Sequence, residues 1–315
     1  STTVLHQEQT RLPNKNSEKT AELYEKLVGK FAKWAETCSD ISAVIIVGSR
    51  ARSDHPADEW ADLDIMIVTS NPERYLSRTD WLENIGNPLL TFVEPTAAGG
   101  EMERRVLFEG MLDVDFAIIP ERKAQQLRHD RISSQIADNI ANTFGRGIRI
   151  LLDKNGIANQ IRTLINSIGA QKVTFPTQNE FHEVINDFLY HAVFTVKHLR
   201  RGEIWGAGMC CNCYMQRLLL RMIEWHAQAT LGQNHDTWFR GRFLEEWADS
   251  RVLEGLRCAF AQYGKEEIKP ALLATMHLFR STATETAEKL GYQYPFTLDS
   301  HVTEWVGRIF SEREV

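Results

Sequence analysis

The segments Ser42-Ala-Val-Ile-Ile-Val-Gly48 and Asp62-Leu-Asp-Ile-Met-Ile-Val-Thr69 decide the fold of the first half of this chain. Each is a short run of apolar, mostly β-branched residues, which predicts a buried strand. The first run ends at Gly48-Ser49, which is typical of a tight turn, and Asn71-Pro72 marks a turn after the second. Two buried strands close together in sequence therefore begin a sheet.

Strands and helices then alternate as far as about residue 152. We expect further strands at 88–93, 104–108, 112–119 and 148–152, and helices at 18–37, 75–85 and 121–139. The strands at 104–108 and 112–119 are expected to form a hairpin joined through Glu109-Gly110-Met111. From residue 157 on the strand patterns stop, and we expect helices at 157–168, 178–201, 207–231, 243–263, 268–290 and 300–310. The predicted fold class is α+β: a loose tail over 1–17, a mixed sheet with helices over 18–172, and an α-helical bundle over 173–315.

The composition excludes several classes of protein. The chain has 315 residues, of which 43% are hydrophobic and 25% charged, enough for the cores of two ordinary domains. No apolar run approaches the roughly 20 residues of a membrane span, and the polar start lacks a signal-peptide core, so we expect a cytoplasmic protein without a membrane partner. The net charge is −6 and the basic residues are scattered, which argues against nucleic acid and favours a cationic small molecule. Both a monomer and a homodimer remain open.

Two carboxylates lie at the start of the second strand. Asp62 and Asp64 are two residues apart, so both side chains are expected on one face of the strand. Neighbouring carboxylates repel each other unless a cation lies between them, and Mg²⁺ prefers hard oxygen ligands that it shares with substrate phosphates. Asp115 completes the site if its strand pairs nearby, although Asp113 shares its face and is a rival for this place. The alternative is that Asp62 and Asp64 face solvent on an edge strand.

The Gly-Ser turn offers groups suited to phosphate. Gly48 lets the backbone come close to a phosphate, and Ser49 is expected to open a helix whose N–H groups, with its hydroxyl, hold phosphate oxygens. Arg50 and Arg52 either add charge-assisted hydrogen bonds to the same phosphates or are ordinary surface charges. The sequence therefore predicts a site at which metal ions and a triphosphate meet.

These motifs together resemble the DNA-polymerase-β-type nucleotidyltransferase superfamily. They are Val47-Gly-Ser-Arg-Ala-Arg-Ser53, Trp60-Ala-Asp-Leu-Asp-Ile65 and Val114-Asp-Phe-Ala-Ile-Ile-Pro120. Within the superfamily, the chain is similar to the aminoglycoside 6-adenylyltransferases (streptomycin adenylyltransferases) over about residues 43–306. The narrower similarity rests on Arg104-Arg-Val-Leu-Phe108, Asn186-Asp-Phe188, Leu199 with Arg201, and Met222-Ile-Glu-Trp-His226.

The resemblance implies a reaction and a fold. ATP and a drug hydroxyl give the adenylylated drug and pyrophosphate, which inactivates an antibiotic such as streptomycin. The implied fold is an N-terminal nucleotidyltransferase domain and a C-terminal helical bundle, with the substrate held between them. By position, Asp62 and Asp64 are metal ligands, and with Asp115 they are expected to hold two Mg²⁺ ions beside the triphosphate.

The same resemblance assigns roles on the bundle. Asp187 matches an acidic position that faces the cleft, where it either binds a cationic drug group or takes the proton from the attacking hydroxyl, a task for which Asp115 is the other candidate. A helix-surface aspartate is the alternative. Glu183 lies one helical turn before Asp187, so the two carboxylates are expected to hold a guanidinium together.

Two departures from the family pattern bear on the identity of the drug. Leu189-Tyr190 stands where two aromatics are expected, and Gly208 stands where relatives carry a lysine that suits phosphate. Lys197, upstream, is the candidate replacement for that lysine as a phosphate ligand. The metal site is unaffected by these departures.

For three other groups of residues, the sequence favours a structural role over metal binding or base stacking. The three cysteines of Cys210-Cys-Asn-Cys213 have no second Cys/His pair at zinc spacing, so we expect buried or half-buried thiols in a reducing compartment. His182, His191 and His198 share one helix without a carboxylate at zinc-triad spacing, which favours core or surface histidines. The tryptophans are expected to pack, with one of them able to line the cleft: Trp81, Trp205, Trp225 and Trp238.

Two other functions stay open. One is a nucleotidyltransferase that modifies another small molecule, a protein or an RNA, although the acidic charge argues against RNA. The other is a nucleotide- or drug-binding relative with little turnover. An intact set of Asp62, Asp64 and Asp115 argues against the latter, because buried carboxylates without a metal only cost stability.

Overall fold

A computed structural model describes residues 15–97, 100–126, 141, 144–168 and 174–312. The chain divides into two compact units, Ser1–Gln171 and Lys172–Val315, and each is described by itself. Residues 1–14, most of the predicted tail, lie outside the described residues. The first helix begins at Lys15, three residues before its predicted start.

Unit 1 is built on a six-stranded mixed sheet with the order β3-β4-β5-β2-β1-β6. Only β2 and β5 run parallel, and the other neighbours are antiparallel. The central strands are the apolar runs that the sequence identifies, because strands covered on both faces are apolar along their whole length. The bounds are β1 Ile41–Val47, β2 Leu63–Thr69, β3 Pro88–Pro95, β4 Met102–Phe108, β5 Leu112–Pro120 and β6 Arg149–Asp153.

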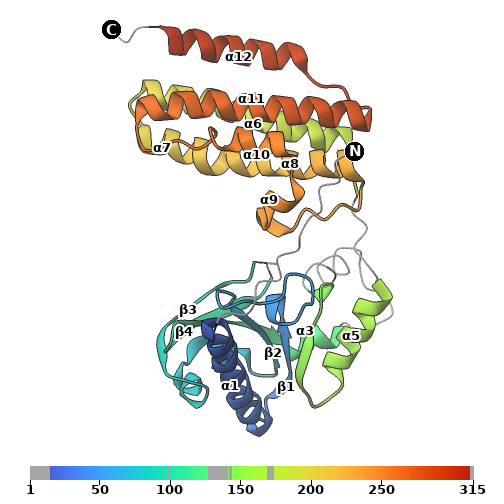
Figure 1. The fold of residues 1–315 in the computed structure, drawn as a ribbon. Coiled ribbons are helices and arrows are strands. Elements are labelled where there is room, and N and C mark those ends of the chain that lie inside the picture. Colours follow the sequence, from blue (N-terminus) through green and yellow to red (C-terminus); the bar gives the residue numbers. More distant parts are fainter. Residues whose placement is uncertain (1–14, 98–99, 127–140, 142–143, 169–173, 313–315) are drawn as a thin grey trace. The chain divides into compact units, whose positions relative to one another are not determined.

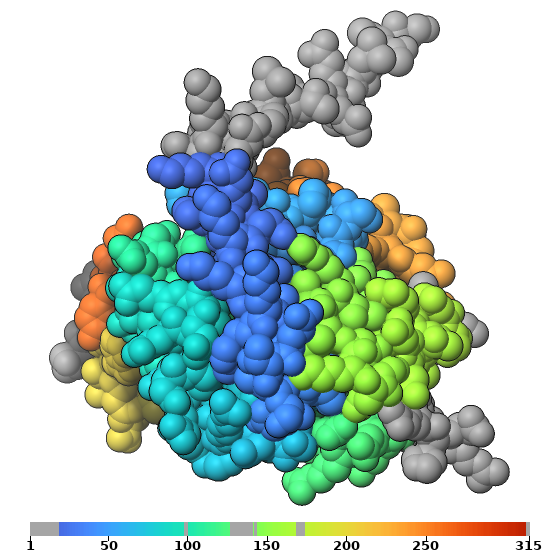
Figure 2. Space-filling view, turned by 90° about the horizontal axis from the view of Figure 1, so that it is seen from below, coloured from blue at the N-terminus to red at the C-terminus, as the bar shows by residue number. Residues whose placement is uncertain are grey.

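Helices cover both faces of this sheet (Figure 1). On one face lie α1 (Lys15–Thr37), α2 (Pro72–Ser77) and the 3₁₀ turn η2 (Asp80–Asn84). Here Phe31 is fully buried and the Trp34 ring stacks on Trp81 at 5.6 Å. The other face is covered by α3 (Glu121–Gln126) and α5 (Ile157–Ile168). Figure 2 shows α1, in dark blue, along the near side of the unit.

Three local predictions for unit 1 need correction or restriction. The helix expected over 75–85 is wrong, because the chain turns extended at Arg78 (φ −110°, ψ 153°) and splits it into α2 and η2. The turn at Gly48–Arg50 is one 3₁₀ turn, η1, and not the start of a longer helix. Of the helix expected over 121–139, only Glu121–Gln126 is described, and residues 127–139 lie outside the described part.

Unit 2 is helical throughout its described length. Its first long helix, α6 (Gln178–Arg200), begins with a capping box, because Thr177 and Glu180 satisfy each other's free N–H groups. The helices α6, α8 and α11 pack on one another, and α12 lies on α6 (Figure 1). The other bounds are α7 Ile204–Met209, the π-helical turn η3 Cys210–Tyr214, α8 Met215–Leu231, α9 Leu244–Trp247, α10 Ser250–Leu256, α11 Lys265–Leu290 and α12 Phe296–Ser311.

Stacked rings and a half-buried ion pair hold these helices together. Phe188 of α6 stacks on Phe279 of α11 at 3.7 Å, with the ring planes 5° apart. Arg280 of α11 donates to Asp299 of α12, which also accepts from the Tyr294 hydroxyl at 2.8 Å. Among the described residues, every helix is too short or too polar to cross a membrane.

The single helix expected over 243–263 is wrong. Phe243 adopts a positive φ of 54°, and the chain is extended at Ala248, so α9 ends after Trp247. Asp249 then caps a new helix, α10, by accepting a hydrogen bond from the Arg251 N–H at 2.8 Å. The segment therefore forms two short helices.

Candidate active site

Three carboxylates converge where β2 and β5 run side by side. The parallel register pairs Asp64 with Asp115, and Asp62 immediately precedes β2. One ligand oxygen from each of the three lies within 4.8 Å of the others. Asp113, the rival candidate, is not in this group, and its carboxylate accepts a hydrogen bond from the Tyr24 hydroxyl at 2.9 Å. The set of oxygens fits a hard divalent cation.

The Gly-Ser turn lies against this group. Gly48 has a φ of +71°, and a Cβ at this position would be 2.1 Å from Asp64 Oδ2, so the turn tolerates only glycine. The Ser49 Oγ is buried and has no hydrogen-bond partner among the described residues. A buried hydroxyl without a partner is costly, so its place beside the carboxylates suggests that a ligand oxygen completes its bonding.

The two arginines of the turn hold the backbone. Arg50 donates to the carbonyl oxygens of Asp62 (2.9 Å) and Ala61 (2.7 Å), and its guanidinium lies 3.6 Å from the ring centroid of Tyr24. Arg52 donates to the His55 carbonyl oxygen at 3.0 Å. Arg50 thereby fixes the segment that carries Asp62, whereas a bond from Arg50 or Arg52 to phosphate remains a prediction.

Burial and neighbouring charge make Asp115 harder to ionise. Desolvation, against the opposing charge of Arg105 and together with the charges of Glu103 and Asp62, raises its pKa to about 6. Burial also raises the pKa of Glu103, which is 8% exposed. A cation beside these groups would relieve the repulsion among them.

Sequence reasoning missed Arg105 and Glu103 as neighbours of the site. Arg105 lies opposite Asp115 across β4 and β5, and its Nη1 is 3.2 Å from Asp115 Oδ2. Alternation along β4 separates Arg105 from Arg104, whose guanidinium is buried and donates to the Tyr75 carbonyl oxygen at 2.8 Å. The pairing of β4 with β5 confirms the hairpin expected from these two strands, but the sequence analysis did not use that pairing to place Arg105 and Glu103 beside Asp115.

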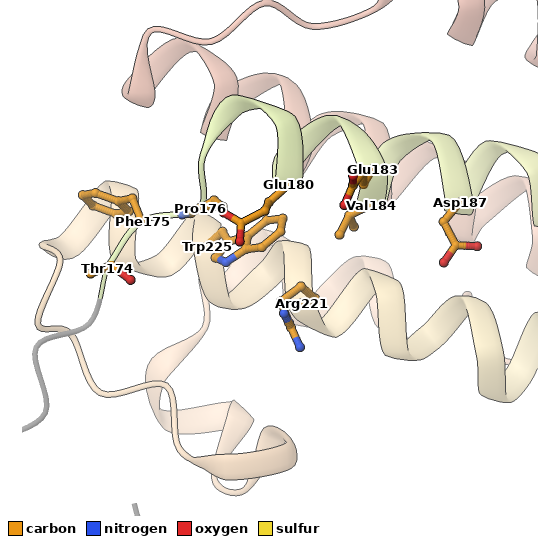
Figure 3. Close-up of a pocket in the computed structure, with 9 residues that line it drawn as sticks. All are labelled: Thr174, Phe175, Pro176, Glu180, Glu183, Val184, Asp187, Arg221 and Trp225. Carbon is orange, nitrogen blue, oxygen red and sulfur yellow. The ribbon is translucent and has the colours of Figure 1, made fainter. Parts of the chain in front are cut away.

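Unit 2 contains an acidic pocket of about 440 Å³. Glu180, Glu183 and Asp187 reach it from α6, while Arg221 and Trp225 line it from α8 (Figure 3). The carboxylates outnumber the single guanidinium, so the pocket suits a cation. The remaining lining residues are Thr174, Phe175, Pro176 and Val184.

Asp187 is held by two neighbours in this unit. Its Oδ2 accepts a hydrogen bond from the Tyr214 hydroxyl at 2.9 Å, and its Oδ1 lies 2.7 Å from His191 Nδ1. The bond to Asp187 raises the pKa of Tyr214. Glu183, one turn earlier, accepts from the Asn179 amide at 3.0 Å. The catalytic and drug-binding roles of Asp187 and Glu183 remain predictions.

The departures from the family pattern have simple local surroundings. Lys197 is exposed in the last turn of α6, and its role toward phosphate remains a prediction. Leu189 is buried in the bundle core, whereas Tyr190 is 68% exposed. A Cβ on Gly208 would meet Ile268 Cδ1 at 3.6 Å, an ordinary contact. The glycine is therefore not required by packing.

The surroundings of the cysteines and histidines agree with the plainer readings of those residues. All five cysteines are free, and burial raises the pKa of Cys211 to about 12, which keeps that thiol protonated. His182 bonds to the Gln293 carbonyl oxygen at 2.6 Å, and His198 pairs with Glu203. Within the described ranges, the Asp62–Asp64–Asp115 group is the only cluster suited to a metal. Of the tryptophans, Trp81 is in the core, Trp225 lines the unit 2 pocket and Trp238 packs against the bundle core. Trp205 is 71% exposed, so the packing expected of it is wrong.

A mixed sheet that presents three carboxylates beside a Gly-Ser turn, with a helical bundle in the second unit, is the architecture of a nucleotidyltransferase. The model of one such family, described as streptomycin adenylyltransferase, matches residues 21–309. The chain therefore belongs to the streptomycin adenylyltransferase family, a family of enzymes.

Curated relatives agree with this assignment. An aminoglycoside 6-adenylyltransferase of Bacillus subtilis is 26% identical over 91% of this chain and 97% of its own length. One of Campylobacter jejuni is 27% identical over 87% of this chain and 91% of its own length. One of Staphylococcus aureus is 21% identical over 86% of this chain and 93% of its own length.

Proposed function

We propose that this protein transfers AMP from Mg-ATP to a hydroxyl of an aminoglycoside, with streptomycin the first choice, and releases pyrophosphate. The modified antibiotic would be inactive. Support comes from the family and from the relatives, which bear the name aminoglycoside 6-adenylyltransferase. The observation that carries the proposal is the convergence of Asp62, Asp64 and Asp115 beside the Gly48-Ser49 turn.

The residues of unit 1 fit the nucleotide end of this reaction. Asp62, Asp64 and Asp115 would hold two Mg²⁺ ions, which when bound supply positive charge for the phosphates and make the attacking hydroxyl more acidic. Gly48 leaves space for close approach of the nucleotide, and the free Ser49 hydroxyl would donate to one of its oxygens. Asp115 or Asp187 would accept the proton of the attacking hydroxyl.

The residues of unit 2 fit the cationic substrate. Glu183 and Asp187 line one pocket, so two carboxylates from successive turns of α6 are available to one ligand. A guanidinium bonds in a bidentate manner to carboxylates, and streptomycin carries two guanidinium groups. This match is the reason for placing streptomycin before aminoglycosides that carry only amines.

The direct test uses Asp62→Asn and Asp64→Asn, measured by pyrophosphate release with Mg²⁺ and ATP across a panel of aminoglycosides. We expect each change to abolish release, because loss of a ligand charge removes several kcal/mol of transition-state stabilisation, on the order of 10²–10³ in rate. The melting temperature of the metal-free variants should equal or exceed that of wild type, because one of several repelling carboxylates is gone. Near-normal turnover in either variant would rule out the metal assignment.

A further inference from the structure

Arg105 lies among three carboxylates that three adjacent strands bring together. Its guanidinium is 3.1 Å from Glu103 Oε1 and 3.2 Å from Asp115 Oδ2, and it also contacts Glu94. The register places Arg105 opposite Asp115 on β5 and Glu94 opposite Glu103 on β3 and β4. The planar guanidinium of arginine has several N–H donors and can bond to all three carboxylates, which a single ammonium cannot do.

Two of these three carboxylates are buried. Glu103 is 8% exposed and Asp115 9%, so an ion pair with Arg105 is less screened here than at an open surface. Glu103 and Asp115 contact the same guanidinium, so Glu103 lies close to this metal ligand. Glu103 nevertheless is not one of the three residues whose oxygens converge.

We propose that Arg105 is a positioning residue of the metal site, which fixes the Asp115 carboxylate and keeps Glu103 from becoming a fourth ligand. The proposal rests on the proposed function, because it requires the three aspartates to hold metal ions. Mg²⁺ in phosphate-transferring sites uses few protein carboxylates and leaves positions for water and substrate phosphates. A further carboxylate would bind the ion more tightly and occupy a position that a phosphate oxygen needs.

If Arg105 has this role, replacing it should tighten metal binding and slow turnover. In Arg105→Gln a positive charge is lost and Glu103 is released, so we expect the Kd for Mn²⁺ without nucleotide to fall about tenfold, while kcat falls at least about tenfold. Arg105→Lys keeps the positive charge but loses the several N–H donors of the guanidinium. The Kd of this variant for Mn²⁺ should stay within about threefold of wild type, while kcat still falls. Electron paramagnetic resonance of Mn²⁺ measures the Kd directly.

A second change separates the release of Glu103 from a general defect. Adding Glu103→Gln to Arg105→Gln removes the new ligand, and the Kd for Mn²⁺ should return toward the wild-type value. Arg78→Gln is the matched control, because Arg78 forms an exposed pair with Asp80 on the same unit. It should change neither quantity.

The outcomes distinguish this proposal from the proposed function. Weaker Mn²⁺ binding in Arg105→Gln, or a double variant that binds like the single one, would overturn the role of Arg105 and leave the metal site standing. If wild type and Asp64→Asn bind Mn²⁺ equally, the metal site itself is wrong. Tighter binding with lower kcat, reversed by Glu103→Gln, is the result that the structure predicts.

Discussion

At the scale of single residues, the site depends on the absence of a Cβ at one position of the turn and on a free hydroxyl at the next. Gly48 has no Cβ, and any Cβ there would occupy the place of Asp64 Oδ2. Ser49 presents a buried hydroxyl without a partner among the described residues. A buried hydroxyl without a partner is costly, and both features fit the close approach of a nucleotide phosphate that the proposed function requires.

Glu224 of α8, outside the metal site, is a half-buried carboxyl group whose ionised form lowers the stability of the fold. Burial raises its pKa to about 7, and Arg221, 3.8 Å away, only partly opposes this. The folded state therefore binds a proton more tightly than the unfolded state does. The stabilising effect of that proton is fully present below pH 4.5 and is lost as pH rises through about 7.

We expect Glu224→Gln to stabilise the protein at pH 8 and to have little effect at pH 4.5. The gain at pH 8 is at most about 3 kcal/mol, because the pKa shift exceeds two units and each unit corresponds to about 1.4 kcal/mol. Denaturant unfolding at the two pH values measures it. Glu245→Gln, at an exposed position of α9, is the control and should show no such pH-dependent gain. A gain of equal size at both pH values would contradict the account.

At the scale of elements, α6 carries the acidic residues of unit 2 at helical spacing. Glu180, Glu183 and Asp187 occupy one side of the helix and line one pocket. The π-helical turn η3 precedes α8 and brings the Tyr214 hydroxyl to Asp187. Such turns re-aim side chains within a helical run and are frequent at functional sites.

Asp187→Ala should weaken aminoglycoside binding or turnover far more than ATP binding. The change removes one negative charge from an acidic pocket, and a charge-assisted hydrogen bond contributes about 1.5–3 kcal/mol, or roughly 10- to 150-fold in Kd. Calorimetry with each ligand separately measures the two affinities, and Tyr263→Phe, an exposed site in the same unit, is the control. If ATP affinity collapses while drug affinity holds, the assignment of α6 to the drug is wrong.

Elements with one dominant local signal could be predicted from the sequence. β1 and β2 are found within one residue of the expected bounds, because a buried strand is apolar along its whole length. The helix predicted over 243–263 failed, since its apolar spacing continued through a break at Ala248. The Asp249 cap at that break was present in the sequence but was outweighed by the spacing of the apolar residues.

The three aspartates of the candidate site could be predicted from the sequence, but two of their neighbours were not identified. Asp62, Asp64 and Asp115 belong to motifs that stand out in one sequence, and the structure brings them together. Arg105 and Glu103 reach the same site only through the pairing of β4 with β5. The hairpin of β4 and β5 was predicted, whereas the parallel pairing of β5 with β2, which brings this hairpin to Asp62 and Asp64, depends on tertiary packing that the pattern of an individual strand does not encode.

At the scale of the whole molecule, the proposed function assigns the nucleotide to unit 1 and the cationic substrate to unit 2. Unit 1 carries the carboxylate group suited to metal and nucleotide, and unit 2 carries an acidic pocket suited to a cation. Each unit has hydrophobic clusters of its own. The net charge of −6 is consistent with a cationic substrate for the protein as a whole.

The most direct test of this account is the mass of streptomycin after incubation with the protein, Mg²⁺ and ATP. We predict that streptomycin gains one AMP, that kanamycin, which offers amines without guanidinium groups, does not, and that Asp64→Asn leaves both drugs unchanged. The comparison of the two drugs tests the substrate, and the variant tests the metal site. Unmodified streptomycin with wild-type protein, or streptomycin modified equally well by Asp64→Asn, would contradict the account.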